Sequence, residues 1–190
     1  MSALFDQMEY CAAHGLAHDE ASFTQILALL ENDNWRVRYA AAIALGDRRD
    51  PRAVDPLVEA LRREEKDPLF TQPKLEGSAH AGSNEPFAIK FPEGTTEETK
   101  EAWRRRGRLL QAICAALGNI GVATPAGLEF LHSYALNQDR DYMVRAAACK
   151  ALGRMGQPES LPVLEKASTD EEWCTSCEAK KAVAKMKGQA

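Results

Sequence analysis

VRYAAAIALGDRRDPRAVDPL, residues 37–57, is matched 107 positions later by VRAAACKALGRMGQPESLPVL, residues 144–164. Both stretches carry V-R, then A-A, then A-L-G, and finally a proline and a leucine. A third copy, LLQAICAALGNIGVATPAGLEFL at 109–131, lies between them, with its Leu-Gly step 72 positions after the first and 35 before the last. A helical pattern that recurs with a period in the thirties indicates an array of stacked helical repeats.

Each copy predicts two helices, because apolar residues fall at helical spacing and are followed by a glycine and then by a capping residue with a proline. We interpret Gly46, Gly118 and Gly153 as the stops of the first helices, since glycine adopts the left-handed conformation easily. A capping residue and a proline then start the next helix, at Asp50-Pro51, Thr124-Pro125 and Gln157-Pro158.

Weaker copies extend the array at both ends, with 19–30 matching 50–61 and Trp173 matching Trp35. The sequence therefore predicts an all-α protein, a right-handed α-solenoid of helix pairs with one long non-repeat insertion. We expect one domain over 1–190. Its parts are an N-terminal capping helix at 1–15, repeats at 19–47, 50–121, 124–155 and 158–188, and an insertion at 66–99.

Three of the five cysteines occupy one repeat position, where Cys11, Cys114 and Cys149 align with Ala42. Equivalent residues of stacked helices lie ~8–10 Å apart, whereas a disulfide needs Cα atoms within ~7 Å. We therefore interpret these cysteines as small buried apolar residues. Their spacing matches no disulfide framework, which fits a reducing compartment.

Composition limits the function classes. The chain has 45% hydrophobic and 27% charged residues, as is typical of a globular protein, and a formal net charge of -4. That charge gives no general attraction to nucleic acid or to an anionic membrane. The N-terminus lacks the pattern of a signal peptide, and no segment approaches the roughly 18 apolar residues of a spanning helix. We expect a cytoplasmic protein without membrane contact.

The string V-R-x-x-A-A-x-A-L-G followed by D-P-x-A-x-x-x-L resembles the HEAT-like repeats of the phycobilisome-lyase type. The resemblance covers most of the chain outside 66–99. It implies that the V-R-x-x-A-A helix of each pair lines a concave surface. A related enzyme type, deoxyhypusine hydroxylase, places His-Glu pairs on these helices to hold iron. Here the matching positions are Tyr39-Ala40 and Ala146-Ala147, so that activity is excluded.

The resemblance also implies which residues face the groove. They are Trp35, Arg36, Tyr39, Ile43, Arg108, Gln111, Tyr142, Met143, Trp173, Cys174 and Cys177. Trp35, Tyr142 and Trp173 share one register, and an exposed aromatic column would anchor a protein partner. Alternatively, these three residues staple the start of each helix against the preceding one.

The insertion at 66–99 contains four prolines and three glycines, which exclude a continuous helix. Its PFAIKF stretch alternates apolar and polar residues, so Phe87, Ile89 and Phe91 could lie along a helical face as one extended segment. Such a long loop is either functional or disordered, and we favour a binding role because exposed phenylalanines are costly. Thr95 or Thr96 is expected to cap the next helix, with Glu98 in reach of a capping box.

Two further features carry alternative functions. Arg104, Arg105, Arg106 and Arg108 could grip phosphates with Trp103 stacked on a base, although Glu101 lies one turn before Arg105, as in an ordinary ion pair. Cys174 and Cys177 have redox-like spacing near a predicted helix start, or are partly exposed bystander thiols, and no second ligand pair suggests zinc.

We thus predict a non-catalytic protein–protein interaction module, an adaptor, scaffold or assembly factor, that binds a protein partner through the concave groove and the insertion. No catalytic residue, metal site or cofactor is expected. The resemblance leaves a second hypothesis, a bilin or tetrapyrrole lyase or chaperone subunit with Arg36, Arg108 and Lys150 around the chromophore. Nucleic-acid binding through 104–108 is the third and least favoured.

Overall fold

The structure, a computed structural model, describes residues 3–17, 19–65, 91, 93–138 and 141–188. Every regular element in these ranges is a helix, which confirms the all-α prediction. In chain order the elements are α1 (Ala3–His14), α2 (Glu20–Leu29), α3 (Trp35–Arg48), the 3-10 helix η1 (Pro51–Ala53), α4 (Val54–Glu65), α5 (Glu97–Ile120), α6 (Pro125–Leu136), α7 (Tyr142–Met155), the 3-10 helix η2 (Pro158–Ser160), α8 (Leu161–Ala167) and α9 (Trp173–Met186). No helix within the described ranges is long and apolar enough to span a bilayer.

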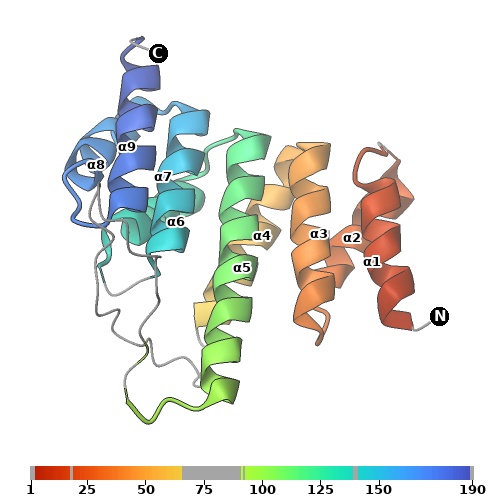
Figure 1. Ribbon diagram of the computed structural model, residues 1–190. Coiled ribbons are helices and arrows are strands. Elements are labelled where there is room, and N and C mark those ends of the chain that lie inside the picture. Colours follow the sequence, from red (N-terminus) through yellow and green to blue (C-terminus); the bar gives the residue numbers. More distant parts are fainter. Residues whose placement is uncertain (1–2, 18, 66–90, 92, 139–140, 189–190) are drawn as a thin grey trace.

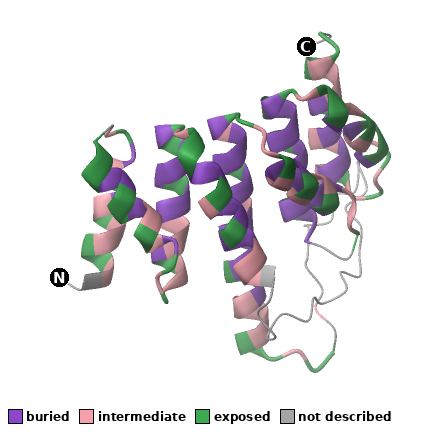
Figure 2. Cartoon of the chain, turned by 180° about the vertical axis from the view of Figure 1, so that it is seen from behind, coloured by how far each residue is buried: buried purple, intermediate pink, exposed green. Residues whose placement is uncertain are grey.

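The helices form two layers, as expected for an α-solenoid. Helices α1, α3, α5, α7 and α9 stand side by side in one layer, each packed against the next (Figure 1). Behind them, α4 packs on α6 and α6 on α8, while α2 packs on α3. Buried residues concentrate where neighbouring helices face one another (Figure 2). Each helix pair therefore buries its apolar face against the adjacent pairs, which is how a repeat array builds a continuous core.

The arginine of the V-R step, which is present in α3 and α7, ties a helix to a neighbouring turn. In α3, Arg38 donates to the main-chain carbonyls of Asn32 and Asp33 and forms an ion pair with Glu64 of α4. In α7, Arg145 is buried and pairs with Asp170 in the turn before α9. Arg38 thus holds the turn before its own helix and Arg145 the turn before α9, whereas the copy at 109–131 has Leu110 at this position.

The glycines of the A-L-G step are not helix stops, contrary to our prediction. Gly46 lies inside α3 and Gly153 inside α7, each two residues before the end of its helix. A β-carbon on Gly46 would lie 2.7 Å from the Cα of Ala116 in α5, and one on Gly153 would lie 2.9 Å from the Cα of Ala182 in α9. The missing side chain therefore permits close approach of neighbouring helices rather than helix termination.

The C-cap residues, which follow the last residue of each helix, lie three residues after these glycines. Arg49, Gly121 and Gly156 adopt left-handed conformations, with φ of 56°, 73° and 66°. Two of the three predicted N-caps at the starts of the following helices are confirmed. The Asp50 carboxylate accepts from the amide of Arg52, and the Thr124 hydroxyl accepts from the amide of Gly127. Gln157 occupies the third cap position without a side-chain hydrogen bond.

The aligned cysteines are buried, as predicted. Cys11, Cys114 and Cys149 are at most 1% exposed, and Ala42 is completely buried. Burial raises the pKa of the Cys11 thiol to about 11, and it raises the pKa values of Cys114 and Cys149 to about 12. Neutral thiols of this kind act as packing residues.

The N-terminal turns of α5 hold the end of the insertion. Thr96 caps the helix and accepts from the amide of Thr99, which occupies the place we expected for Glu98. Phe91 packs edge-on against Trp103 with ring centroids 5.4 Å apart, and Trp103 is buried. The prediction that Phe91 lies on a helical face is thus confirmed, while Phe87 and Ile89 lie outside the described residues.

Candidate functional site

Two adjoining hollows open on the surface of the first layer. The larger, about 500 Å³, lies over α3, α5 and α7, and the smaller, about 280 Å³, lies over α5, α7 and α9. Gln111, Ala147 and Lys150 line both hollows, so we treat them as one feature, the α3–α9 groove. Its lining residues are Tyr39, Ile43, Asp47, Arg108, Gln111, Ala112, Ala115, Ala116, Asn119, Met143, Ala146, Ala147, Lys150, Arg154, Trp173, Cys174, Cys177, Glu178 and Lys181.

Alanines account for the depth of the groove. Ala112, Ala115 and Ala116 come from α5, and Ala146 and Ala147 come from α7. Short side chains on adjacent helices leave space that the longer side chains around them border. The floor therefore follows from the same alanine-rich repeat positions that allow the helices to approach closely.

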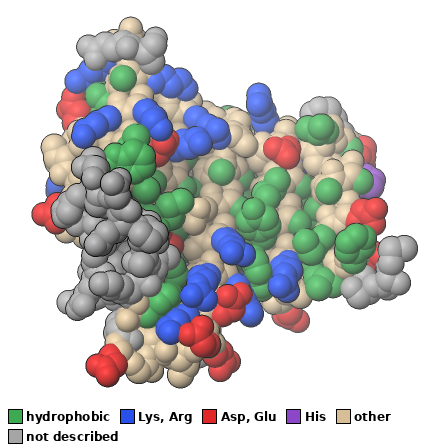
Figure 3. Space-filling view, in the orientation of Figure 1, with side chains coloured by type: hydrophobic (Ala, Val, Ile, Leu, Met, Phe, Trp, Pro, Cys, Tyr) green, Lys and Arg blue, Asp and Glu red, His purple; other side chains and the backbone are tan. Residues whose placement is uncertain are grey.

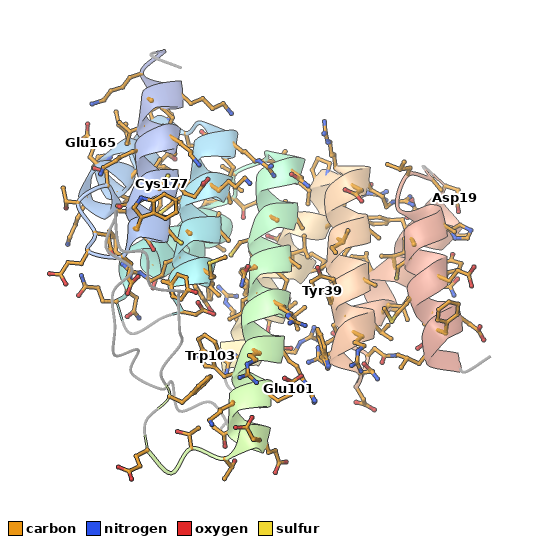
Figure 4. The ribbon with its side chains drawn as sticks, viewed as in Figure 1. Asp19, Tyr39, Glu101, Trp103, Glu165 and Cys177 are labelled. Atoms are coloured by element: carbon orange, nitrogen blue, oxygen red, sulfur yellow. The ribbon has the colours of Figure 1, made fainter. Side chains whose placement is uncertain are left out.

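Most residues that the sequence assigned to the groove do line it. Tyr39, Ile43, Arg108 and Gln111 border the larger hollow, and Met143, Trp173, Cys174 and Cys177 border the smaller one. Figure 4 labels Tyr39 on α3 and Cys177 on α9, near opposite ends of the groove. Trp173 is half exposed, at 50%, and Ile43 and Met143 are also exposed. The groove therefore offers large apolar side chains to solvent at both ends.

Trp35 and Arg36 lie at the start of α3, outside the set of lining residues. The Trp35 ring meets Tyr39 edge-on with centroids 6.3 Å apart, and the Arg36 guanidinium lies 5.2 Å from the Trp35 ring centroid. Trp35 thus supports the orientation of Tyr39. The chromophore hypothesis grouped Arg36 with Arg108 and Lys150, but only the last two border the same hollow.

Tyr142 does not belong to the exposed surface, so this part of the prediction is wrong. Its side chain is only 5% exposed, although it shares the repeat register of Trp35 and Trp173. The start of α9 covers it, where the Thr175 hydroxyl donates to the main-chain carbonyl of Tyr142 at 3.2 Å. The three residues therefore do not form an exposed aromatic column. Tyr142 is a buried packing residue, and its described contact is with the following helix α9 rather than with the preceding one.

Of the two phenylalanines predicted as insertion contacts, the structure describes only Phe91, which is not among the lining residues of the groove. Phe87 lies outside the described residues. Phe91 is half-buried beside Trp103, with Lys100 and Arg104 over its ring at 5.9 Å and 5.7 Å. Its described contacts thus anchor the chain at the start of α5.

Positive charge dominates the groove. Arg108, Lys150, Arg154 and Lys181 face two acids, Asp47 and Glu178. Glu178 forms an ion pair with Lys181 at 2.7 Å. Figure 3 shows Lys and Arg side chains over α5, α7 and α9 on this face, with hydrophobic side chains between them. The groove can therefore attract negative charge even though the whole chain is acidic.

Sequence reasoning missed several lining residues, among them Asp47, Asn119, Arg154 and Lys181. The signal that could have found them is helical spacing. Asp47 follows Ile43 by four residues, and Lys181 follows Cys177 by four, so each pair lies on one helix face. The predicted positions ended at Ile43 in α3 and at Cys177 in α9, whereas the hollows extend further along both helices, to Asp47 and Lys181.

The Cys174–Cys177 pair is partly exposed beside Trp173. Burial is the main cause that raises the pKa of the Cys174 thiol, and the negative charge of Glu172 is the next. The pKa is raised even though Cys174 is the second residue of α9, and a position at a helix N-terminus usually lowers the pKa of a thiol. A raised pKa disfavours the thiolate that redox chemistry needs. Within the described ranges, no three His, Cys, Asp or Glu side chains are close enough to hold a metal ion.

The basic run in α5 is divided between surface and interior. Arg104 and Arg105 both pair with Glu101, at 3.8 Å and 2.9 Å, which is the ordinary ion-pair arrangement. Arg106 and Trp103 are buried. Trp103 therefore cannot stack on a base, and of the four arginines only Arg108 faces the groove.

One polar pair was not apparent from the sequence. Nε2 of His132 in α6 lies 2.9 Å from Oγ of Ser160, which comes 28 residues later in η2. Burial lowers the pKa of His132, and Ser160 is completely buried. This hydrogen bond joins α6 to the next repeat. Because the Ser160 hydroxyl is buried, a substrate cannot reach it.

Comparison with known proteins places the repeats in a family. The family model described as HEAT repeats matches residues 7–69 and 104–176. A search of curated proteins gives no match. Among solved structures, human deoxyhypusine hydroxylase in complex with glycerol is similar, with a TM-score of 0.40 and 17% identity over 98% of this chain and 81% of that one.

Proposed function

Since the chain belongs to the family of HEAT repeats, we propose that it is a non-catalytic interaction module that binds a protein partner in the α3–α9 groove. HEAT repeats generally mediate protein interactions, and stacked repeats present extended surfaces suited to that purpose. The phycobilisome-lyase subgroup remains a hypothesis that rests on the sequence resemblance alone.

The observation that carries this proposal is the exposure of large apolar side chains around a hollow. Ile43, Met143 and Trp173 come from three different helices of the first layer, yet all are exposed and border the same groove. Exposed apolar side chains that border a hollow mark interaction sites more often than single scattered residues do. Tryptophan in particular is a frequent anchor at protein interfaces.

The insertion supplies the second part of the proposed interface. We retain 66–99 as a binding segment with Phe87 and Phe91 as its candidate contacts, on the strength of its phenylalanines and its length. The proposed compartment is the cytoplasm, because a chain whose five cysteines are free thiols suits a reducing environment.

Affinity capture from a lysate of the source cells, with quantitative mass spectrometry, tests this function. The groove variant is Tyr39→Ala/Trp173→Ala, and the matched control is Phe5→Ala/Leu16→Ala, which removes two exposed apolar side chains at the other end of the array. A third variant replaces 68–90 by a Gly/Ser linker of equal length. Circular dichroism first establishes that each variant is folded.

We expect one protein to be captured by the wild type and the control and lost from the groove variant, because truncated anchors cost about 2 kcal/mol or more each. Its loss from the linker variant would extend the interface to the insertion. Equal capture by the groove variant and the control would contradict the proposal.

A further inference from the structure

The α3–α9 groove has a charge opposite to that of the protein. The chain carries a formal net charge of -4, but cations outnumber acids two to one among the residues that line the groove. Electrostatic complementarity across interfaces guides a protein toward partners of opposite sign. The positive charge of the groove therefore indicates that the partner is negatively charged at this surface, which the fold alone does not indicate.

Three of these cations are available to a partner. Among the residues that the structure describes, no carboxylate lies within ion-pair distance of Arg108 or Lys150. Arg154 donates to the amide oxygen of Asn119, a neutral group that leaves its charge uncompensated. Lys181 already pairs with Glu178. The middle of the groove thus presents three positive charges, from α5 and α7, against the single carboxylate of Asp47.

Apolar side chains flank this positive centre. Trp173 and Met143 border the end near α9, and Tyr39 and Ile43 border the end near α3. A partner that satisfies the whole groove needs carboxylates in its middle and an apolar residue at one end or both. Gln111, which lines both hollows, can donate and accept hydrogen bonds, as a peptide main chain requires.

We propose that the groove binds an acidic peptide segment of the partner protein, with its carboxylates over Arg108, Lys150 and Arg154 and an apolar residue against Trp173. This inference rests on the proposed function and adds the chemistry of the partner. Arginine and carboxylate match in geometry as well as charge.

A nucleic acid fits this surface less well than an acidic peptide. An extended polyanion would pass the acidic start of α5, where Glu97, Glu98 and Glu101 are found. Trp103, the aromatic residue that could have stacked on a base there, is buried. A short acidic segment can stay within the groove and avoid that repulsion.

Fluorescence anisotropy with defined probes tests the inference. The probe is a short labelled peptide of alternating Asp and Glu with one leucine near its end. Comparison probes are the same peptide with Asn and Gln in place of the acids, and single-stranded oligodeoxythymidine. The groove variant is Arg108→Glu/Lys150→Glu. The matched control, Lys166→Glu/Lys185→Glu, makes the same change in net charge at exposed lysines outside the groove.

We expect the acidic peptide to bind the wild type and the control with similar Kd, and the groove variant with Kd raised about tenfold or more, because reversed charges repel the carboxylates. The amide peptide should bind more weakly than the acidic one. Equal weakening by both charge variants would reveal general attraction and overturn the inference. Tighter binding of the oligonucleotide at the same residues would replace it with nucleic-acid binding.

The outcomes also separate this inference from the proposed function. If the acidic peptide fails to bind while Tyr39→Ala/Trp173→Ala still loses a captured protein, the interaction function stands and the acidic partner is wrong. If the captured protein is kept by that variant as well, the groove itself is not the interface, and both proposals fail.

Discussion

Gly118 of α5 lies against Ala151 of α7 so closely that a β-carbon on the glycine would be 2.8 Å from the alanine Cα and 3.0 Å from its Cβ. The alanine of one A-L-G step thus meets the glycine of the preceding step. Leu117 and Leu152, the middle residues of the two steps, are completely buried. The tripeptide is therefore a packing motif that sets the spacing between successive helices of the first layer.

Gly118→Ala tests this motif by urea unfolding. In an exposed helix the substitution would stabilise by about 1 kcal/mol, but here we expect a net loss of about 1–3 kcal/mol because α7 blocks the new methyl group. Gly118→Ala/Ala151→Gly should recover part of the loss, since it removes one of the two obstructing carbons. Stabilisation by Gly118→Ala would show that α5 and α7 can move apart without loss of folding free energy, which contradicts this account.

The buried pair of Arg145 and Asp170 should be worth far more than a surface pair. Arg145→Ala leaves the Asp170 carboxylate buried without its partner, which costs about 3–5 kcal/mol. Lys187→Ala, which breaks an exposed pair with Glu165, should cost less than about 1 kcal/mol. Chemical denaturation of the two variants gives both values. Similar small losses would mean that Arg145 is not essential to the turn before α9.

Asp141 should make stability depend on pH in an unusual direction. Burial raises the pKa of its carboxyl to about 6, above the value of about 3.9 in an unfolded chain. Its protonated form is thus favoured by folding, and this contribution is fully present below pH ~4 and is lost as the pH rises through ~6. The difference between the two limits is about 2–3 kcal/mol.

Asp141→Asn isolates this effect, because asparagine can still accept from the amide of Met143 and does not titrate. Relative to this variant, the wild type should gain stability when the pH falls from 7 to 4. Comparison with the variant removes the opposite trend from Asp19 and Asp50, whose pKa values are lowered by hydrogen bonds from Ser22 and Arg52. A constant difference between the two proteins would contradict the raised pKa.

Thiol labelling should divide the cysteines into two classes. Cys174 and Cys177 are partly exposed, whereas Cys11, Cys114 and Cys149 are buried. At mildly alkaline pH, a maleimide should modify the first two in the native protein and reach the others only in denaturant, as peptide mass spectrometry would show. Rapid native labelling of Cys114 would indicate that α5 and α7 separate readily.

The repeat pattern predicted the fold because it combines local and packing requirements in one motif. Apolar spacing, caps at Asp50 and Thr124, and small residues at the Cys114 position all point to stacked helix pairs. The assignment of Gly118 failed because a helix stop and a close helix contact both select glycine, and the sequence does not distinguish them. The neighbouring helix, which is remote in sequence, decides the role.

The candidate site was harder to predict for a similar reason. Trp35, Tyr142 and Trp173 share a register, but exposure depends on what covers each residue. The beginning of α9 contacts Tyr142, which is buried, whereas Trp173 is half exposed. Arg154 and Lys181 were missed because a groove formed by several helices extends along their axes beyond the positions that a single motif marks.

Site-specific photo-crosslinking in the source cells tests the central claim most directly. A benzophenone amino acid replaces Ile43, Met143 or, as a control, Val122, which are 40%, 39% and 40% exposed. Only the first two border the α3–α9 groove. The account predicts that one and the same protein is cross-linked from Ile43 and Met143 and not from Val122. No cross-linked protein from either groove position, or an equal yield from Val122, would contradict it.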